Sequence, residues 1–450
     1  MFGLSYNTFL VLAGSGLLGL TAGVVGAFAV LRRRSLMGDA LAHAALPGLC
    51  IAFLLYQQRN FFIFLAGATV TGILGVLCVS WLRHNTRIKE DAAIGLVLSV
   101  FFGMGIVLSS IIQDLPTGQK AGLDSYLLGQ TAGMVMQDLI SIIAVSLAAL
   151  LVLLLFFKEF TILSFDPEYA AVQGWPTFLL DLAMMGLLVI TTVIGLPAVG
   201  VVLMAALLII PGVAARFWTD QLKWMLILAA LFGLITGIAG TAASATLSDL
   251  PAGPVIVLTG TIIFLFSMLF APRRGILSRG IEHLRLRATI ARQNLLRSMY
   301  EFTEPALPER RAIAIEELTR ARSWSAGQVE RLLSREARRS HVEPVAGGWR
   351  LTPSGVEAAA QVVRSHRLWE TFLIENAEIA PDHVDRDADQ IEHILSPDLL
   401  HKLEEHLREA GRWPRGAGEL PPASAHATPA LFPTPAQPES KVADDGGKPL

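Results

Sequence analysis

Residues 8–34 read TFLVLAGSGLLGLTAGVVGAFAVLRRR, an uncharged and mostly apolar run that ends in three arginines. A helix that rises about 1.5 Å per residue needs roughly 20 residues to cross about 30 Å of lipid hydrocarbon. Further apolar runs of similar length lie at 37–56, 61–82, 92–112, 136–157, 178–196, 198–215, 224–246 and 253–271. The sequence therefore predicts an all-α polytopic membrane protein with about nine transmembrane helices.

The composition separates this membrane part from a different C-terminal part. The 450 residues are 53% hydrophobic and only 16% charged, which excludes an ordinary soluble protein. Beyond Pro272, charged residues become frequent and no apolar run is long enough to span. Cys50 and Cys78 lie inside apolar runs, so we expect no disulfide framework. The opening MFGLSYNTFL lacks a basic region, which indicates a first span and not a removed signal peptide.

The basic residues of the loops predict the orientation in the membrane. One side receives Arg32, Arg33, Arg34, Arg83, Arg87, Lys89, Lys158, Arg216, Lys223, Arg273 and Arg274. The other side receives only Arg59 and Lys120. Because cytoplasmic loops carry the excess of Lys and Arg, we expect the N-terminus outside and the C-terminus in the cytoplasm. An odd span count agrees, although merging the short hairpin expected around Gly195-Leu196-Pro197 would break this parity.

Five regions follow from these patterns. We expect a transmembrane permease-like domain at 1–272, a basic linker helix at 273–300 and a winged-helix-like domain at 301–365. A helical, metal-sensor-like segment follows at 366–410. The tail at 411–450 is rich in Pro, Ala, Gly and Ser and has too little apolar content to offset the entropy of ordering, so we expect it to be disordered.

Two ionisable residues stand out in the second apolar run. In LRRRSLMGDALAHAALPGL, residues 31–49, Asp39 and His43 are four apart and share one helical face. Such residues are costly inside a membrane and persist where they face a cavity or a ligand. A carboxylate and an imidazole together form a half-site for Mn²⁺, Zn²⁺ or Fe²⁺. An Asp–His hydrogen bond, or a helix N-cap by Asp39, would explain the same residues.

A short cytoplasmic helix is expected between two spans, in the loop 165–176. Asp166 can cap the helix, and Pro167 fits its first position. With Glu168, Asp166 also marks the loop as cytoplasmic. Such a helix can transmit force from a partner, and a plain connecting turn is the alternative.

Three separated motifs carry a resemblance over most of residues 1–272. They are SLMGDALAHAALPG at 35–48, FDPEYAAVQGWP at 165–176 and GLPAVGVVLMAALLIIPGVAAR at 195–216. In this order they resemble the membrane subunits of the zinc, manganese and iron ABC importers. The resemblance implies a non-catalytic permease in the bacterial cytoplasmic (inner) membrane, paired as a homodimer or with a paralogous permease, with no cofactor of its own. Manganese is the favoured cargo, with zinc and iron as alternatives.

The same resemblance implies roles for residues and partners. Asp39 and His43 would line the metal route, and an extracytoplasmic metal-binding protein would deliver the ion. The coupling loop, including Asp166, Pro167, Glu168 and Gly174, would insert into an ATP-binding subunit. The chain has no GxxxxGK[ST] phosphate loop, so ATP hydrolysis would reside on that separate polypeptide.

The cytoplasmic part shows a helix, a helix–turn–helix and a two-stranded wing over 292–365. Ile315, Leu318, Val329, Leu332 and Leu333 have the spacing of a small helical core. The second helix of the pair carries arginines that could contact DNA, a weak signal: Arg331, Arg335, Arg338 and Arg339.

Over roughly 110 residues, from this winged-helix pattern to about residue 407, the sequence resembles the diphtheria toxin repressor family of metal-responsive regulators. The resemblance lies in the order of the wing, SHRLWETFLIE and HVDRDADQIEHILS. The resemblance places His366, Glu370, Asp385, Asp389, Glu392 and His393 at or near metal-ligand positions, as a possible regulatory site. An oxygen at 389 in place of a soft sulfur favours Mn²⁺ or Fe²⁺. The first helix, which contributes a ligand in that family, offers only Met299. A solvated charged face is the alternative for the six residues.

Two other functions fit parts of the pattern. The spans could anchor a metal-responsive DNA-binding regulator, although one span would suffice for that, so nucleic acid is the less favoured partner. An ion-coupled secondary carrier would need more acidic residues within the membrane than this chain has.

Overall fold

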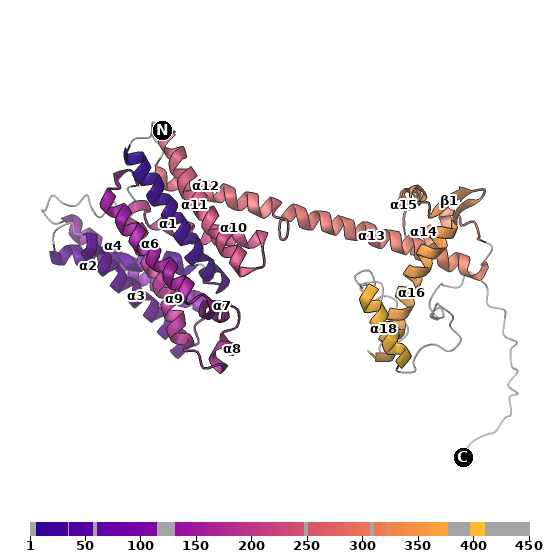
Figure 1. Cartoon of the computed structure of the whole chain (residues 1–450), viewed down its shortest axis with the longest axis horizontal. Coiled ribbons are helices and arrows are strands. Elements are labelled where there is room, and N and C mark those ends of the chain that lie inside the picture. The colour runs from indigo at the N-terminus through magenta and orange to yellow at the C-terminus, as the bar shows by residue number, and fades with distance from the viewer. Residues whose placement is uncertain are drawn as a thin grey trace, which may run out of the picture. The chain divides into compact units, whose positions relative to one another are not determined.

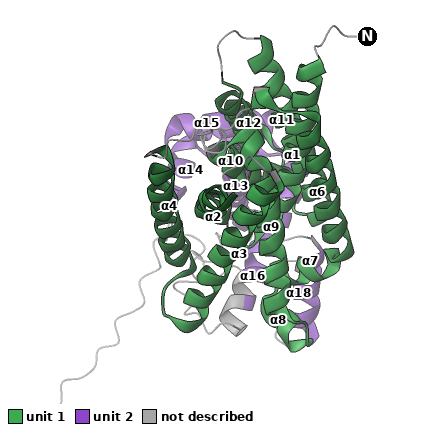
Figure 2. Cartoon of the chain, turned by 90° about the vertical axis from the view of Figure 1, so that its left-hand side faces the viewer, with its two compact units in different colours: residues 1–280 green, residues 281–450 purple. Residues whose placement is uncertain are grey.

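The computed structural model describes residues 6–34, 36–56, 61–114, 131–246, 251–306, 310–322, 324–376 and 397–409. The chain forms two compact units, residues 1–280 and residues 281–450 (Figure 2). The tail expected to be disordered, 411–450, lies outside the described residues.

The first unit is a bundle of long apolar helices (Figure 1). Its spanning elements are α1 (Tyr6–Leu31), α2 (Leu36–Tyr56), α3 (Phe61–Asn85), α4 (Glu90–Asp114), α6 (Met136–Leu155), α9 (Thr177–Val199), α10 (Val201–Trp218), α11 (Leu222–Thr246) and α12 (Ala252–Phe270). Among the described residues, eight helices are long and apolar enough to cross a membrane, and α10 supplies a shorter apolar segment, Leu203–Trp218. This confirms the predicted all-α membrane fold.

Close helix packing in this unit depends on glycine. A Cβ at Gly19 of α1 would collide with the backbone oxygen of Gly233 in α11, and one at Gly48 of α2 would collide with that of Gly67 in α3. Lipid is as apolar as these helices, so backbone approach through small residues, and not a hydrophobic driving force, brings them together.

The break between α9 and α10 differs from the predicted hairpin at 195–197. Helix α9 continues through Pro197 to Val199, and the chain turns at Gly200, whose φ is +83°. A proline in the last helical turn removes only one backbone donor, whereas the left-handed conformation favours a residue without a Cβ. The boundary predicted at Pro197 was therefore wrong by a few residues, because the helix ends at the glycine and not at the proline.

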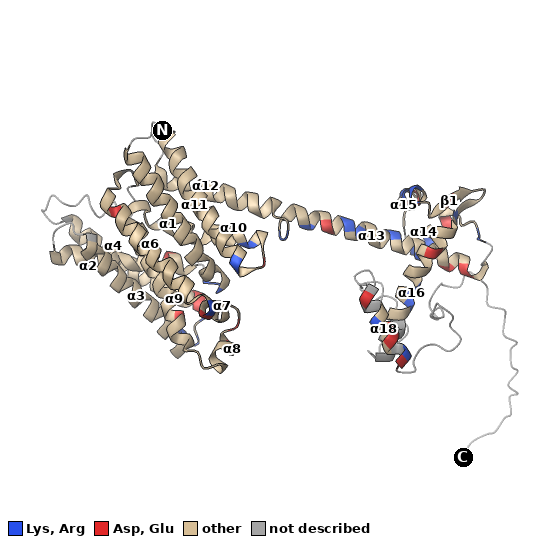
Figure 3. Ribbon diagram, in the orientation of Figure 1, with Lys and Arg blue, Asp and Glu red and all other residues tan. Residues whose placement is uncertain are grey.

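Short elements complete the unit. A 3-10 turn, η1 (Thr131–Gly133), precedes α6, and α7 (Phe157–Phe165) and α8 (Pro167–Val172) lie between α6 and α9. In Figure 3 the long helices of this unit carry few charged residues, as lipid contact requires, in contrast to α13 (Ile276–Thr303).

The second unit begins within α13 (Ile276–Thr303), the predicted basic linker helix. Its other elements are η2 (Glu304–Ala306), α14 (Ile315–Arg322), α15 (Ala326–Arg338), β1 (Val342–Val345), β2 (Gly348–Leu351), α16 (Pro353–Asn376) and α18 (Pro397–Glu409). The strands pair antiparallel, with Val342 opposite Leu351. This order of two helices and a hairpin agrees with the predicted winged-helix pattern.

The core of the second unit contains much of the predicted set. Leu318, Val329 and Leu333 are fully buried, and Ile315 and Leu332 pack against them. The last turns of α13 join the same core through residues that include Leu296 and Met299. The linker helix is therefore also the first helix of the second unit. Helix α16 runs without interruption across 365/366, where the sequence analysis had placed a domain boundary.

Candidate metal site and its supporting network

Helix α2 places Asp39 and His43 one turn apart at its N-terminal end. His43 Nε2 lies 3.5 Å from Asp39 Oδ1, beyond the usual range of an N–H···O hydrogen bond. The helix begins at Leu36, ahead of Asp39, so Asp39 lies within the first turn and is not an N-cap. Neither simple structural explanation of the pair is therefore satisfied by this geometry.

The imidazole of His43 has an unused acceptor or donor. Its Nδ1 is buried and has no hydrogen-bond partner among the described residues. The ring packs edge-on against Phe102 of α4, with 4.6 Å between ring centroids. Buried polar atoms are nearly always paired, so the unpaired Nδ1, on the side of the ring away from the Nε2 that approaches Asp39, indicates a partner that the described residues lack.

The separation of the two groups fits one cation. Two ligands that each lie about 2.1 Å from a tetrahedral ion are about 3.4 Å apart. The Asp39 side chain is 40% exposed and that of His43 is 20% exposed, so both can be reached from outside the chain. Within the described residues no group of three or more His, Cys, Asp or Glu converges. One chain thus supplies a two-ligand half-site.

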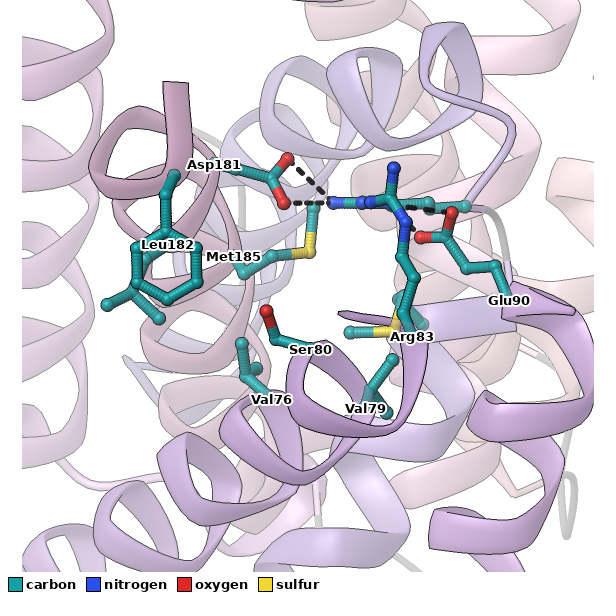
Figure 4. Close-up of a pocket in the computed structure, with 11 residues that line it drawn as sticks. Val76, Val79, Ser80, Arg83, Glu90, Asp181, Leu182 and Met185 are labelled. Carbon is teal, nitrogen blue, oxygen red and sulfur yellow. Dashed lines mark hydrogen bonds and ion pairs between the residues drawn. The ribbon is translucent and has the colours of Figure 1, made fainter. Parts of the chain in front are cut away.

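A buried arginine, Arg34, precedes Asp39 by five residues in the sequence. Figure 4 shows two of the residues that line a pocket with it, Asp181 and Glu90. Arg34 donates from Nη1 to both carboxylate oxygens of Asp181, at 2.7 and 2.8 Å, and it also pairs with Glu90. The Arg34 side chain is only 6% exposed. Asp181 is in the first turns of α9 and Glu90 begins α4, so one guanidinium connects the turn before α2 to two other helices.

Arg32 extends the network toward α7. Its Nη2 lies 2.9 Å from Asp181 Oδ1, and its Nη1 donates to the backbone oxygen of Leu163 at 2.6 Å. Burial lowers the pKa of the Arg32 guanidinium, and the charge of Asp181 opposes that shift. Arg33, between the two, adopts a left-handed φ of 59° in the tight turn.

Sequence reasoning missed this network. It used Arg32 and Arg34 only to orient the chain, and it gave Asp181 no role. A signal was present, because Asp181 is an acidic residue inside the apolar run 178–196 and therefore predicts a cationic partner. The partner could not be named, because Arg34 is 147 positions away in sequence.

The coupling loop folds as the sequence predicted locally. Asp166 Oδ1 accepts a hydrogen bond from the backbone N–H of Tyr169 at 2.8 Å, and Pro167 occupies the first helical turn of α8. Gly174 closes the helix with φ +82°. Around this cap, Asp166, Pro167 and Glu168 are exposed, and so are apolar side chains that include Val172, at 87%. The loop therefore presents an apolar surface with acidic edges.

The structure describes only some of the candidate metal ligands in the second unit. His366 is buried in α16, and its Nδ1 lies 3.0 Å from Arg297 Nη1 of α13. Glu370 follows one turn later in α16, and its side chain lies outside the described residues. The same is true of four whole residues: Asp385, Asp389, Glu392 and His393.

The predicted DNA-contacting arginines are on α15. Arg331, Arg335, Arg338 and Arg339 are all exposed, and Arg339 lies 3.5 Å from the buried Glu336. Glu336 is held mainly by His341, whose Nδ1 is 2.8 Å away.

Comparison with known proteins places both units. The bundle is that of a polytopic membrane protein, and residues 5–271 match the ABC 3 transport family. The chain belongs to the ABC 3 transport family. Residues 352–420 match the iron dependent repressor, metal binding and dimerisation domain.

Individual relatives agree with this assignment. The manganese transport system membrane protein MntC of Bacillus subtilis is 40% identical over 414 residues, covering 91% of this chain and 93% of that protein. The zinc transport system membrane protein TroC of Treponema pallidum is 45% identical over 267 residues, covering 59% of this chain and 90% of that protein. PsaBC from Streptococcus pneumoniae in complex with Fab has a TM-score of 0.55 and 32% identity, covering 62% of this chain and 95% of that one. The alignment with MntC, at 414 residues, is longer than the first unit of this chain. The Bacillus subtilis protein therefore also shares sequence with the second unit.

Proposed function

We propose that this permease subunit carries Mn²⁺ inward across the bacterial cytoplasmic membrane through the half-site of Asp39 and His43. The observation that supports this most strongly is the 3.5 Å separation of His43 Nε2 and Asp39 Oδ1, which suits two ligands of one ion. The other ring nitrogen, the buried Nδ1, has no partner among the described residues and would be free to carry the proton of a metal-bound imidazole. Relatives that share 40 and 45% of their residues are named as manganese and zinc transport proteins. The oxygen and imidazole ligands suit both ions, and the absence of a thiolate from the pair favours the harder Mn²⁺.

A second permease copy completes the site in this proposal. Asp39 would be costly if its exposed side faced lipid, so that side faces a partner chain or water. Two copies would bring together two carboxylates and two imidazoles around one ion. An extracytoplasmic binding protein would load this site from outside.

ATP hydrolysis on a separate subunit would reach the site through α8 and the arginine network. The exposed loop around Val172 docks on the ATP-binding subunit and leads directly into α9. A shift of α9 moves Asp181, which holds Arg34 by two hydrogen bonds. Arg34 precedes Asp39 by only five residues, so the α9 movement changes the position of the first turn of α2.

Uptake of ⁵⁴Mn²⁺ in cells tests the site assignment. Asp39→Ala and His43→Ala should each lower uptake at least about tenfold, since even residues that only support a metal ligand typically cost 10–100-fold. Matched controls are Asp91→Ala in the first turn of α4 and His283→Ala in α13, both exposed, and they should retain wild-type uptake. Normal uptake by Asp39→Ala, at normal membrane abundance, would defeat the proposal.

The exposed arginines of α15 support nucleic acid as a second candidate partner, for the cytoplasmic unit alone. Detergent-solubilised full chain would then shift duplex DNA, with an affinity that falls steeply as salt rises. Arg335→Ala should weaken that binding. No shift at low salt would leave the unit without a DNA-binding role and would not affect the transport proposal.

A further inference from the structure

A buried arginine lies at the centre of the cytoplasmic unit, next to the candidate ligand His366. The Arg297 side chain is 4% exposed. Its Nε donates to Glu301 Oε1 at 2.8 Å, one turn along α13, and its Nη1 lies 3.0 Å from Nδ1 of His366 in α16. The guanidinium thus bridges two helices and contacts two side chains of the types that ligate metals.

The direction of the hydrogen bond to His366 follows from the chemistry of arginine. A guanidinium has only donors and remains charged in proteins, so Nδ1 must accept. Accepting occupies the lone pair of Nδ1, and in a neutral imidazole the other nitrogen then carries the proton. Neither ring nitrogen therefore offers a lone pair to a metal ion. A dication near this ring would also be repelled by the positive charge of Arg297.

A second arginine joins α16 to the short turn that follows α13. Arg367 of α16 is buried, and it donates to both carboxylate oxygens of Glu304 in η2, at 2.9 and 2.6 Å. Met299 of α13 and Val363 of α16 also belong to one buried apolar cluster. Met299 is 0% exposed, so its sulfur is part of that core. Ionic and apolar contacts therefore hold α13 to α16 with groups of the protein alone.

These residues do not fit a metal ion at His366, although the family matched by residues 352–420 is described as a metal-binding domain. We propose that the guanidinium of Arg297 takes the place of a metal ion at His366, so that the cytoplasmic unit joins α13 to α16 without metal. Described residues elsewhere in the unit offer no cluster of three metal-ligating side chains. This inference concerns a different unit from the transport site and does not depend on it.

The wild-type cytoplasmic site can be tested in a full chain that carries Asp39→Ala and His43→Ala, which remove the membrane half-site. Thermal unfolding is followed with EDTA, with MnCl₂ and with ZnCl₂, alongside the metal content of the dialysed protein. A metal that binds the folded form raises its melting temperature by mass action, so we expect midpoints within about 1 °C of one another. A bound equivalent of either metal that disappears with His366→Ala would overturn the proposal.

Charge reversal gives the complementary test. In the same background, Arg297→Glu places a carboxylate opposite His366 beside Glu301, and we expect it to gain one equivalent of Mn²⁺ or Zn²⁺ that His366→Ala removes. Arg287→Glu, on the exposed part of α13, is the matched control and should gain none. Equal, His366-dependent metal binding by the Arg297→Glu and Arg297 forms would show that the guanidinium excludes nothing, and the proposal would fail.

Discussion

Two histidines that the sequence selects as candidate ligands, His43 and His366, lie next to groups of opposite charge: a carboxylate at His43 and a guanidinium at His366. Each is four residues from a carboxylate on its own helix. His43 faces Asp39 and has a buried Nδ1 without a partner among the described residues, whereas Nδ1 of His366 accepts from Arg297. Spacing within one helix therefore identifies candidate ligands, whereas a group from another helix determines whether a cation can bind to them.

The arginines near each histidine show the same contrast. Arg34, close to the membrane half-site, is held by Asp181 and Glu90. In the second unit Arg297 contacts the histidine itself. Four groups of substitutions and one metal measurement test this contrast, in decreasing order of effect.

Removing the carboxylate that holds Arg34 should have the largest effect on folding. Asp181→Asn removes the charge that Arg32 and Arg34 share and leaves Arg34 with Glu90 as its acidic partner. Removing one partner of a buried ion pair costs up to about 3–5 kcal/mol of unfolding free energy. Detergent melting curves of the purified chain measure it. Asp220→Asn, which removes an exposed carboxylate paired with Arg273 and Arg274, is the control and should change stability far less. Equal effects of the two substitutions would contradict a special role for the network.

Weakening the contact between Arg367 and Glu304 in the second unit should lower the free energy of unfolding by a smaller amount. Glu304→Gln keeps the shape but removes the charge that Arg367 contacts through two hydrogen bonds. Hydrogen bonds to charged groups contribute about 1.5–3 kcal/mol, so we expect a loss in that range. Melting should stay insensitive to EDTA in this variant, and a new requirement for metal would argue against a metal-free clamp.

Asparagine at position 366 tests the hydrogen bond that His366 accepts. Its side-chain oxygen can accept from Arg297, so His366→Asn should cost less than about 1 kcal/mol, whereas His366→Ala should cost about 1–3 kcal/mol. Melting curves of the full chain measure both losses. If His366→Asn destabilised as much as His366→Ala, accepting from Arg297 would not be the role of His366.

The smallest effect is expected on the surface of α15. Arg335 is exposed, so Arg335→Ala should change the unfolding free energy by less than about 0.5 kcal/mol. Melting of the full chain checks it, and a large loss would show that α15 uses Arg335 for packing and not for a partner.

Sequence reasoning predicted what depends on local pattern. Apolar length placed the spans, and Asp166-Pro167 placed the start of α8, because a cap and a first-turn proline act within a few residues. It could not predict contacts between distant elements, such as Arg34 with Asp181 or Arg297 with His366, since nothing in either segment names its partner. The predicted boundary between α9 and α10 was wrong by a few residues, because proline is a weaker signal of a helix end than a glycine that adopts a left-handed conformation.

The most direct measurement is the Mn²⁺ content of the purified full chain under equilibrium dialysis, compared among wild type, His43→Ala and His366→Ala. We expect the amount of bound Mn²⁺ to fall sharply in His43→Ala and to equal that of the wild type in His366→Ala. Mn²⁺ that survives His43→Ala and disappears in His366→Ala would contradict it, since the metal would then reside where the structure places a guanidinium.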